Sequence, residues 1–244
     1  MNNTGLVSIS FRKHSPEEIV NAVNEAGLDA IEWGGDVHCP HGDIGKAAAV
    51  KTCSGSLLLP EYGSYYTVGQ PDAVPFENVL ASAKTLGTPA IRVWGGNKSS
   101  DALYTADYQA LVDDAVRICR MAGETLVCLE CHPHTVTDEY HTAVRFLKDV
   151  AMPNLRLFFQ PNQFRDVKYN LETIDATLPW ITSVHVYSWD REKKFPLRDG
   201  QASWRQYLNL LKQKDGLSYM LEFMHDDRIE SLKETAATLK EWLV

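Results

Sequence analysis

The strongest constraint on the fold is the regular alternation of short apolar runs with amphipathic stretches from one end of the chain to the other. Short runs of this kind are typical of buried strands, and amphipathic stretches with apolar residues three and four positions apart are typical of helices. The predicted strands are residues 5–11, 29–33, 56–59, 90–94, 125–130, 155–160, 181–187 and 217–223. The predicted helices are residues 15–27, 43–52, 76–86, 105–122, 138–150, 171–178, 203–212 and 227–242.

Strands that alternate singly with helices favour an α/β protein with a parallel sheet. At 244 residues the chain has the length of one (β/α)8 barrel, which typically needs about 250 residues. We therefore predict a single (β/α)8 TIM barrel that forms one domain over residues 1–244. A doubly wound sheet is the alternative, but no glycine-rich phosphate-binding fingerprint follows the first predicted strand.

Charge and composition exclude several classes of partner. The net charge of −8 argues against nucleic acid or an anionic membrane as the main partner, because both require clustered Lys and Arg. No stretch of sequence approaches the roughly 20 apolar residues of a membrane-spanning helix. The odd count of five cysteines, in a chain large enough to fold without disulfides, indicates reduced thiols and a cytoplasmic protein.

Three side chains that can bind metal lie at or near the ends of different predicted strands. Glu130 ends the fifth strand, His185 lies in the seventh and Glu222 lies in the eighth. In a parallel barrel these strand ends meet at one rim, which carries the active site. Strand alternation directs the three side chains inward, and large apolar neighbours such as Val184 and Phe223 outward toward the helices. Charged groups are rarely buried unless they are paired or bound to an ion, so this pattern predicts an enzyme.

Oxygen and imidazole ligands suit Mn²⁺, Mg²⁺, Co²⁺ or Zn²⁺. A fourth ligand is expected from the sixth strand, where Gln160 is the residue in phase at the end. Its amide oxygen can coordinate a cation but is neutral, and it binds more weakly than the carboxylate of Asp. We therefore predict one divalent metal ion bound by Glu130, Gln160, His185 and Glu222.

The segments Leu129-Glu130-x-His132-Pro133, Ser183-Val-His185 and Leu221-Glu222-Phe223 make the chain similar to the xylose isomerase-like superfamily of sugar and sugar-phosphate isomerases and epimerases. The resemblance covers essentially the whole chain. Ketose 3-epimerases of this superfamily bind one divalent metal through Glu, Asp, His and Glu, and their two glutamates exchange protons with the substrate.

This resemblance implies that Glu130 and Glu222 are the catalytic acid/base pair and that His185 is a metal ligand. It also implies that Arg191 contacts a substrate oxygen near the metal, and that the protein forms a homodimer. The sequence departs from the family on the sixth strand, where Gln160 replaces an Asp and Gln163 replaces a His. Both departures bear on the affinity and the identity of the metal.

Further substrate contacts are predicted at His38, Trp94 and His132. His132 is in phase with Glu130, Trp94 ends the fourth strand, and His38 lies in the polar loop 34–42. An exposed loop histidine is an equally good interpretation of His38, and aromatic residues such as Trp94 are also ordinary barrel filling. A basic cluster at residues 191–198 follows the seventh strand, where barrels often bind phosphate, although charge runs are usually solvated surface.

The predicted function is that of an isomerase or epimerase that acts on a sugar, a sugar phosphate or a related polyol ketone. Two alternatives stay open. The same proton abstraction followed by loss of water would make the protein a dehydratase of the inosose or dehydroshikimate type. Gln160 and Gln163 would also be compatible with a barrel that binds sugar without catalysis.

Overall fold

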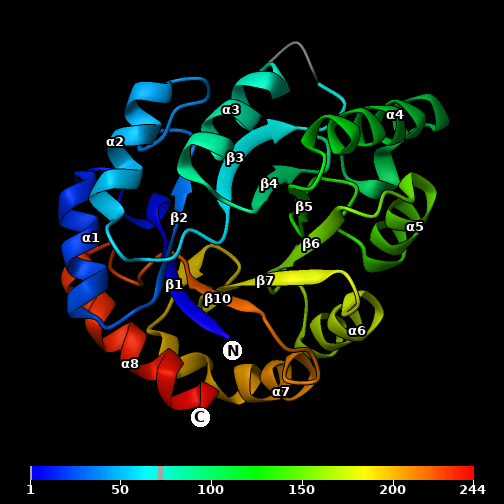
Figure 1. Ribbon diagram of the computed structural model, residues 1–244. Helices are drawn as coiled ribbons and strands as arrows, with labels where there is room; N and C mark the ends of the chain where they lie inside the picture. Colours follow the sequence, from blue (N-terminus) through cyan, green and yellow to red (C-terminus); the bar gives the residue numbers. More distant parts are fainter. Residues whose placement is uncertain (1, 71–73) are drawn as a thin grey trace.

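Eight parallel strands form a closed barrel that is surrounded by helices (Figure 1). The computed structural model describes residues 2–70 and 74–244. The strand order around the barrel is β1-β10-β7-β6-β5-β4-β3-β2, and β1 pairs with β2 to close it. This arrangement confirms the predicted (β/α)8 TIM barrel.

The barrel strands are β1 Asn3–Val7, β2 Ala30–Gly34, β3 Tyr62–Thr67, β4 Ala90–Trp94, β5 Leu126–Glu130, β6 Leu155–Phe159, β7 Ile181–Val186 and β10 Ser218–Leu221. The surrounding helices are α1 Pro16–Glu25, α2 Ile44–Ser54, α3 Phe76–Leu86, α4 Thr105–Ala122, α5 Tyr140–Val150, α6 Val167–Thr177, α7 Gln201–Leu211 and α8 Leu232–Leu243. A small antiparallel pair, β8 Trp189–Asp190 and β9 Lys193–Lys194, follows β7. Short 3-10 helices are η1 Ser8–Phe11, η2 Ser100–Ala102, η3 Leu197–Gly200 and η4 Ile229–Ser231.

The third strand was predicted at the wrong place. Residues 56–59 contribute only an isolated bridge between Leu58 and Ala30, and the strand that enters the barrel is β3. Pro60, which has no N–H to donate to a ladder, ends the first segment before the chain reaches Tyr62. Tyr62, Tyr65 and Tyr66 therefore lie on the strand and not in the loop after it.

The first strand was predicted too long. It was expected to reach Phe11, but β1 ends at Val7. The next residues, Ser8–Phe11, turn into η1, and the hydroxyl of Ser8 accepts a hydrogen bond from the backbone N–H of Gly34 at 2.9 Å. This turn places Ile9 at the mouth of the barrel. The sixth helix also begins earlier than predicted, at Val167, because the Asp166 carboxylate caps it by accepting from the N–H of Tyr169.

The core consists of two apolar layers that follow from strand alternation. Val127 and Leu129 belong to the large cluster between the barrel and the helices, together with helix residues such as Phe146. The intervening residue Cys128 belongs to a separate cluster with Phe158 inside the barrel. The outward orientation predicted for Val127, Leu129 and Val184 is confirmed, and the inward-facing positions remain available for polar groups.

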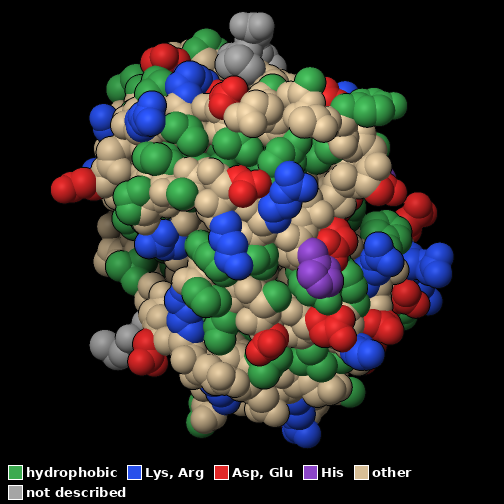
Figure 2. Space-filling model, turned by 90° about the vertical axis from the view of Figure 1, so that its right-hand side faces the viewer, with side chains coloured by type: hydrophobic (Ala, Val, Ile, Leu, Met, Phe, Trp, Pro, Cys, Tyr) green, Lys and Arg blue, Asp and Glu red, His purple; other side chains and the backbone are tan. Residues whose placement is uncertain are grey.

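The outer surface carries mixed charges. Figure 2 shows one side of the molecule, on which basic and acidic side chains are interspersed and neither kind gathers into a broad field. Among the helices in the described part of the chain, none is both long and apolar enough to cross a bilayer.

Candidate metal centre and active site

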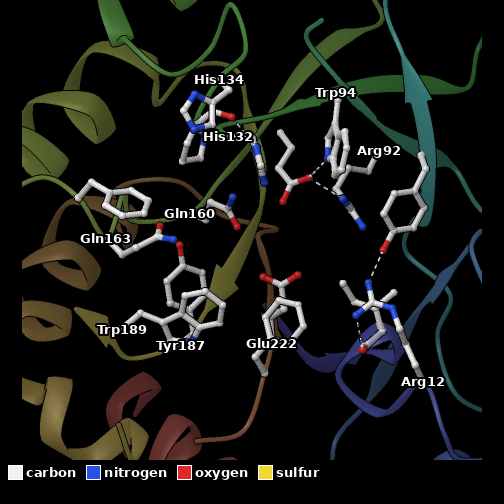
Figure 3. Close-up of a pocket in the computed structure, with 16 residues that line it drawn as sticks. Arg12, Arg92, Trp94, His132, His134, Gln160, Gln163, Tyr187, Trp189 and Glu222 are labelled. Carbon is white, nitrogen blue, oxygen red and sulfur yellow. Dashed lines mark hydrogen bonds and ion pairs between the residues drawn. The ribbon is translucent and has the colours of Figure 1, made fainter. Parts of the chain in front are cut away.

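A cavity of about 390 Å³ opens at the C-terminal ends of the barrel strands. Its size falls in the range of roughly 300–1,000 Å³ that is usual for small-molecule sites. The lining includes five residues predicted from the sequence to form the site: Trp94, Glu130, His132, Gln160 and Glu222. Figure 3 shows side chains from several strands and loops directed into this cavity.

Glu130, His185 and Glu222 converge below the cavity. The Nδ1 atom of His185 lies 3.5 Å from Oε1 of Glu130 and 3.6 Å from Oε2 of Glu222. The ligand atoms of all three residues lie within 4.8 Å of one another, and all three side chains are buried. Strands β5, β7 and β10 thus bring two carboxylates and one imidazole to a single point.

Two further buried charges hold this group in place. The guanidinium of Arg92 donates from Nε to Oε1 of Glu32 at 2.7 Å and from Nη1 to Oε2 of Glu130 at 2.5 Å. The other oxygen of Glu32 lies 3.1 Å from Nε2 of His185. Arg92 is 2% exposed and Glu32 is fully buried, so these ion pairs are shielded from solvent.

The two oxygens of the Glu130 carboxylate have different surroundings. Both Arg92 and the indole N–H of Trp94 donate to Oε2, the latter at 2.7 Å. The other oxygen, Oε1, is the one that faces His185. Two donors therefore fix the orientation of the carboxylate while one oxygen stays available to an ion or a substrate.

Two glycines allow close packing inside the barrel, and one of them makes room for the buried charges. A Cβ atom on Gly63 would lie 2.4 Å from Oε1 of Glu32 and 2.8 Å from Nη2 of Arg92. Any larger residue would therefore force the Glu32–Arg92 pair apart. At Gly5, a Cβ would lie 2.6 Å from the carbonyl oxygen of Ala30 and from the side chain of Met220, so the floor of the barrel is equally close-packed.

The two glutamates that flank His185 titrate differently. Burial alone would raise the pKa of Glu130, but the charges of Arg92 and His185 hold it well below its usual range. Burial raises the pKa of Glu222 to about 7, and the nearby charge of Glu130 adds to this effect. Pairs of carboxyl groups whose environments separate their pKa values in this way are typical of acid/base sites.

Burial would lower the pKa of His185, yet the charges of Glu222 and Glu32 raise it well above its usual range. Protonated imidazole cannot bind a metal, so metal binding at this position would displace a proton.

The donor set fits a divalent metal ion. Nδ1 of His185 is buried and has no hydrogen-bond partner among the described residues, although it faces two carboxylate oxygens. Two ligands that each lie about 2.0–2.2 Å from one ion are roughly 3–3.5 Å apart. The distances of 3.5 and 3.6 Å from Nδ1 of His185 to the two carboxylate oxygens are close to this range. Gln160 is 8% exposed, and its amide points into the same cavity as Glu222 (Figure 3). Glu130, His185, Glu222 and Gln160 are therefore the residues that could hold the ion.

The predicted substrate-contact residues occupy different places. His132 lines the cavity and stacks on Trp94, with ring centroids 5.0 Å apart. His38 is 2% exposed, hydrogen-bonds to Ser8, and lies outside the cavity lining. Arg191 is exposed with a φ of 56° and also lies outside the lining, so the structure places neither His38 nor Arg191 against the cavity.

The basic cluster at residues 191–198 is partly neutralised by ion pairs. Lys194 pairs with Asp227, and Arg198 pairs with Glu241 at 2.9 Å. These pairs leave less positive charge for a phosphate group than the sequence suggested.

Phe223 does not face the helices as predicted. The strand β10 ends at Leu221, and Phe223 has a positive φ of 52°, which changes the direction of the chain directly after Glu222. As a result the ring of Phe223 lines the cavity and packs against Trp189, with ring centroids 5.4 Å apart. Strand alternation cannot be extended beyond the last residue that is paired in the sheet.

Sequence reasoning missed three buried charged residues: Glu32, Glu61 and Arg92. Glu32 and Arg92 each lie between apolar residues inside predicted strands, which is the signal that could have identified them. Glu61 is 3% exposed and accepts a hydrogen bond from the hydroxyl of Ser183 at 2.8 Å. Burial raises the pKa of Glu61 to about 8, and the charge of Glu32 acts in the same direction.

No protein-family model matches the sequence, and no curated protein sequence matches it. Solved structures do match over nearly the whole chain. A probable 3-DHS dehydratase from Bacillus anthracis is 20% identical with a TM-score of 0.77, and the match covers 98% of this chain and 99% of that one. A D-psicose 3-epimerase from Clostridium cellulolyticum is 14% identical with a TM-score of 0.72, covering 99% and 98%. A 3-keto-D-glucoside 4-epimerase from E. coli is 14% identical with a TM-score of 0.69, covering 99% and 100%.

These likenesses show that the chain adopts the xylose isomerase-like TIM-barrel fold, as the sequence motifs indicated. Proteins of this fold include sugar epimerases and a dehydratase. Within this fold the chain carries a buried Glu130–His185–Glu222 group that could bind a metal.

Proposed function

We propose that the protein is an isomerase or epimerase that acts on a sugar or a related polyol ketone and moves a proton between Glu130 and Glu222. The observation that carries this proposal is the convergence of the two carboxylates on Nδ1 of His185, directly below a cavity of suitable size. The likeness to two sugar epimerases supports the same class of reaction.

In the proposed reaction, one glutamate removes the proton next to the substrate carbonyl and leaves an enediolate. The other glutamate returns a proton to the opposite face of the same carbon, or to the neighbouring carbon while the proton of the adjacent hydroxyl passes to the former carbonyl oxygen. Arg92 and Trp94 hold Oε2 of Glu130, so that only Oε1 is presented to the substrate. Acid/base catalysis by one such group is worth roughly 10²–10⁴-fold in rate.

A divalent ion bound by Glu130, Gln160, His185 and Glu222 would act as a Lewis acid that stabilises negative charge on the substrate oxygens. The stacked rings of Trp94 and His132 would form one wall of the substrate site. Tyr65, whose ring lies 5.4 Å from that of Trp94, would extend the wall toward the mouth. Such walls orient a sugar ring and exclude water from the reacting carbons.

The proposal is tested by solvent exchange. The protein is incubated in D₂O with Mn²⁺ and each of the neutral ketoses D-fructose, D-tagatose and D-psicose, and incorporation of deuterium next to the carbonyl is followed by NMR. We expect exchange with at least one ketose, and we expect Glu130→Gln and Glu222→Gln each to abolish it while binding survives. Glu234→Gln, which changes an exposed glutamate on α8, is the matched control.

Two outcomes would replace this proposal with another. Loss of water from the substrate, seen as a new enone absorbance, would assign the protein to the dehydratases. Binding of a ketose by metal-free protein, with no exchange in the wild type, would assign a sugar-binding role without catalysis. Undiminished exchange in both glutamine variants would refute the roles given to Glu130 and Glu222.

A further inference from the structure

A second cavity of about 450 Å³ adjoins the one above the metal centre. The two cavities share three lining residues, Pro133, His134 and Phe164, which come from the loops that follow β5 and β6. The outer cavity extends from these residues to Ser99 and Arg165. The two cavities are therefore neighbours that meet at Pro133, His134 and Phe164.

The residues at the border are unusual for a merely structural loop. Phe164 is 51% exposed, so a large aromatic ring stands open between the two cavities. His134 has a φ of 62°, and its Nδ1 lies 3.2 Å from the hydroxyl of Ser99. A residue other than glycine is strained in this backbone region, and such strain is concentrated at binding sites. An open aromatic face is suited to packing against the C–H face of a sugar ring.

The charges around the outer cavity disfavour an anionic ligand, and the two arginines of the inner cavity are already engaged. In the inner cavity, Arg12 is paired with Asp36 at 2.6 Å, and Arg92 is held by two buried glutamates. The outer cavity is lined by the acidic residues Asp101, Asp138 and Glu139 against a single basic residue, Arg165. The guanidinium of Arg165 in turn lies 5.1 Å from the ring centroid of Tyr169. A phosphate or carboxylate that reached the outer cavity would therefore meet more negative than positive charge.

We infer that the outer cavity is a subsite for a second, uncharged sugar ring, and that the natural substrate is a neutral glycoside rather than a monosaccharide or a sugar phosphate. This inference rests on the function proposed for the inner cavity. Each cavity lies in the lower half of the range of roughly 300–1,000 Å³ that small-molecule sites occupy, so the two together suit a ligand of two rings. Phe164 would pack against the ring that bridges them.

The test compares binding of one-ring and two-ring ketoses. Calorimetric titrations with Mn²⁺ present use D-fructose, the glucosyl-fructoses turanose, maltulose and palatinose, and D-fructose 6-phosphate. We expect at least one glucosyl-fructose to bind about tenfold or more tightly than fructose, which corresponds to roughly 1.4 kcal/mol. D-fructose 6-phosphate should bind more weakly than fructose.

Two variants test the subsite itself. Phe164→Ala removes the open ring, and Ser99→Trp fills the outer cavity with a bulky side chain. Both should lower the affinity for the glucosyl-fructose about fivefold or more beyond any change in the affinity for fructose. Tyr104→Ala, which removes an aromatic ring that is 78% exposed and lines neither cavity, is the matched control and should leave both affinities unchanged.

The outcomes separate the two proposals. Equal affinity for fructose and for all three glucosyl-fructoses, or tighter binding of the 6-phosphate, would overturn the inference about the outer cavity and leave the proposed function intact. Equal losses for one-ring and two-ring ligands in Phe164→Ala and Ser99→Trp would overturn it as well. If none of the ketoses binds, the proposed function fails and this inference fails with it.

Discussion

Nε2 of His185 lies 3.1 Å from Oε2 of Glu32, although the two residues are 153 positions apart in the sequence. Both side chains are fully buried. A proton on Nε2 that is donated to Glu32 leaves Nδ1 as the only ring nitrogen that can face Glu130 and Glu222. Glu32 thus selects the nitrogen that would bind the metal, in the manner of the carboxylates that orient metal-binding histidines in other proteins.

The first prediction concerns this orientation. Glu32→Gln keeps the size of the side chain but removes the charge that pairs with His185 and Arg92. Loss of such a partner typically weakens metal binding about 10–100-fold, and we expect a decrease in this range for Mn²⁺. The measurement is the Mn²⁺ dissociation constant by calorimetry, with circular dichroism to verify that the variant is folded.

Glu61→Gln is the matched control for the Glu32 variant, because Glu61 is a buried carboxylate that accepts its hydrogen bond from Ser183 rather than from His185. It should change the Mn²⁺ dissociation constant less than about threefold, well short of the effect expected for Glu32→Gln. Equal Mn²⁺ affinity in Glu32→Gln and the wild type would show that Glu32 does not orient His185.

The sequence was sufficient to predict the barrel and the convergence of Glu130, His185 and Glu222. Each of these polar residues lies at or near the end of an apolar run, where strand alternation and parallel topology together determine its position. Glu32 and Arg92 lie deeper in their strands, and their contact spans 60 residues of sequence. Such a pairing depends on which inward-facing residues share a level of the barrel, and spacing along the chain does not contain that information.

The third strand and the outer cavity could not be predicted for related reasons. β3 contains Gly63 and several tyrosines rather than an apolar run, because Gly63 makes room for the Glu32–Arg92 pair while Tyr62 and Tyr66 fill the space around the barrel. The outer cavity is formed by loops, whose conformation depends on single residues such as His134 with its positive φ. Loops of this kind have no periodic pattern from which their path could be inferred.

A second prediction concerns Gly63. In Gly63→Ala the added methyl group would lie within contact distance of both Glu32 and Arg92, so the ion pair must shift. Overpacking of a rigid core typically costs about 1–3 kcal/mol, and we expect a loss in this range in the free energy of unfolding measured with urea. Gly123→Ala is the comparison, because an added Cβ there meets nothing within 4 Å and the variant carries only the backbone strain of a φ of 64°, a strain that Gly63, whose φ is not positive, does not have.

The Gly123 variant reports only the cost of the backbone, whereas the Gly63 variant should also weaken Mn²⁺ binding through the displaced Glu32 side chain. If Gly63→Ala has wild-type stability and wild-type Mn²⁺ affinity, the close packing of the Glu32–Arg92 pair does not matter for the site.

A third prediction concerns pH. Burial raises the pKa of Glu61 from its ordinary value of 4.5 to about 8, so the folded state favours the protonated form. The contribution of protonated Glu61 to the free energy of unfolding is fully present below pH 4.5 and is lost as the pH rises toward 8. Each unit of difference between the folded and unfolded pKa values corresponds to about 1.4 kcal/mol. The glutamine of Glu61→Gln cannot ionise and loses no stability in this way. We therefore expect the unfolding free energy of the variant to increase relative to that of the wild type as the pH rises through this interval.

The measurement is urea unfolding of both proteins across this range of pH. Glu222 also has a raised pKa, but it is present in both proteins, so its contribution cancels in the difference between them. A difference in unfolding free energy that does not change with pH would show that Glu61 is not buried in its neutral form.

The last prediction returns to the sixth strand, where Gln160 replaces the carboxylate expected from the resemblance. Gln160→Asp adds a third negative charge beside Glu130 and Glu222, and like charges in one buried site repel unless a cation is present. We therefore expect the variant to bind Mn²⁺ about tenfold or more tightly than the wild type, and its metal-free form to melt at a lower temperature. Mn²⁺ should restore the melting temperature, because an ion that binds only the folded state stabilises it.

Gln163→Asp adds the same charge to the lining of the same cavity but outside the expected ligand set, so it should raise the Mn²⁺ affinity far less. Equal effects of the two substitutions would mean that general negative charge, rather than coordination at position 160, accounts for the gain, and Gln160 would then have no place among the metal ligands.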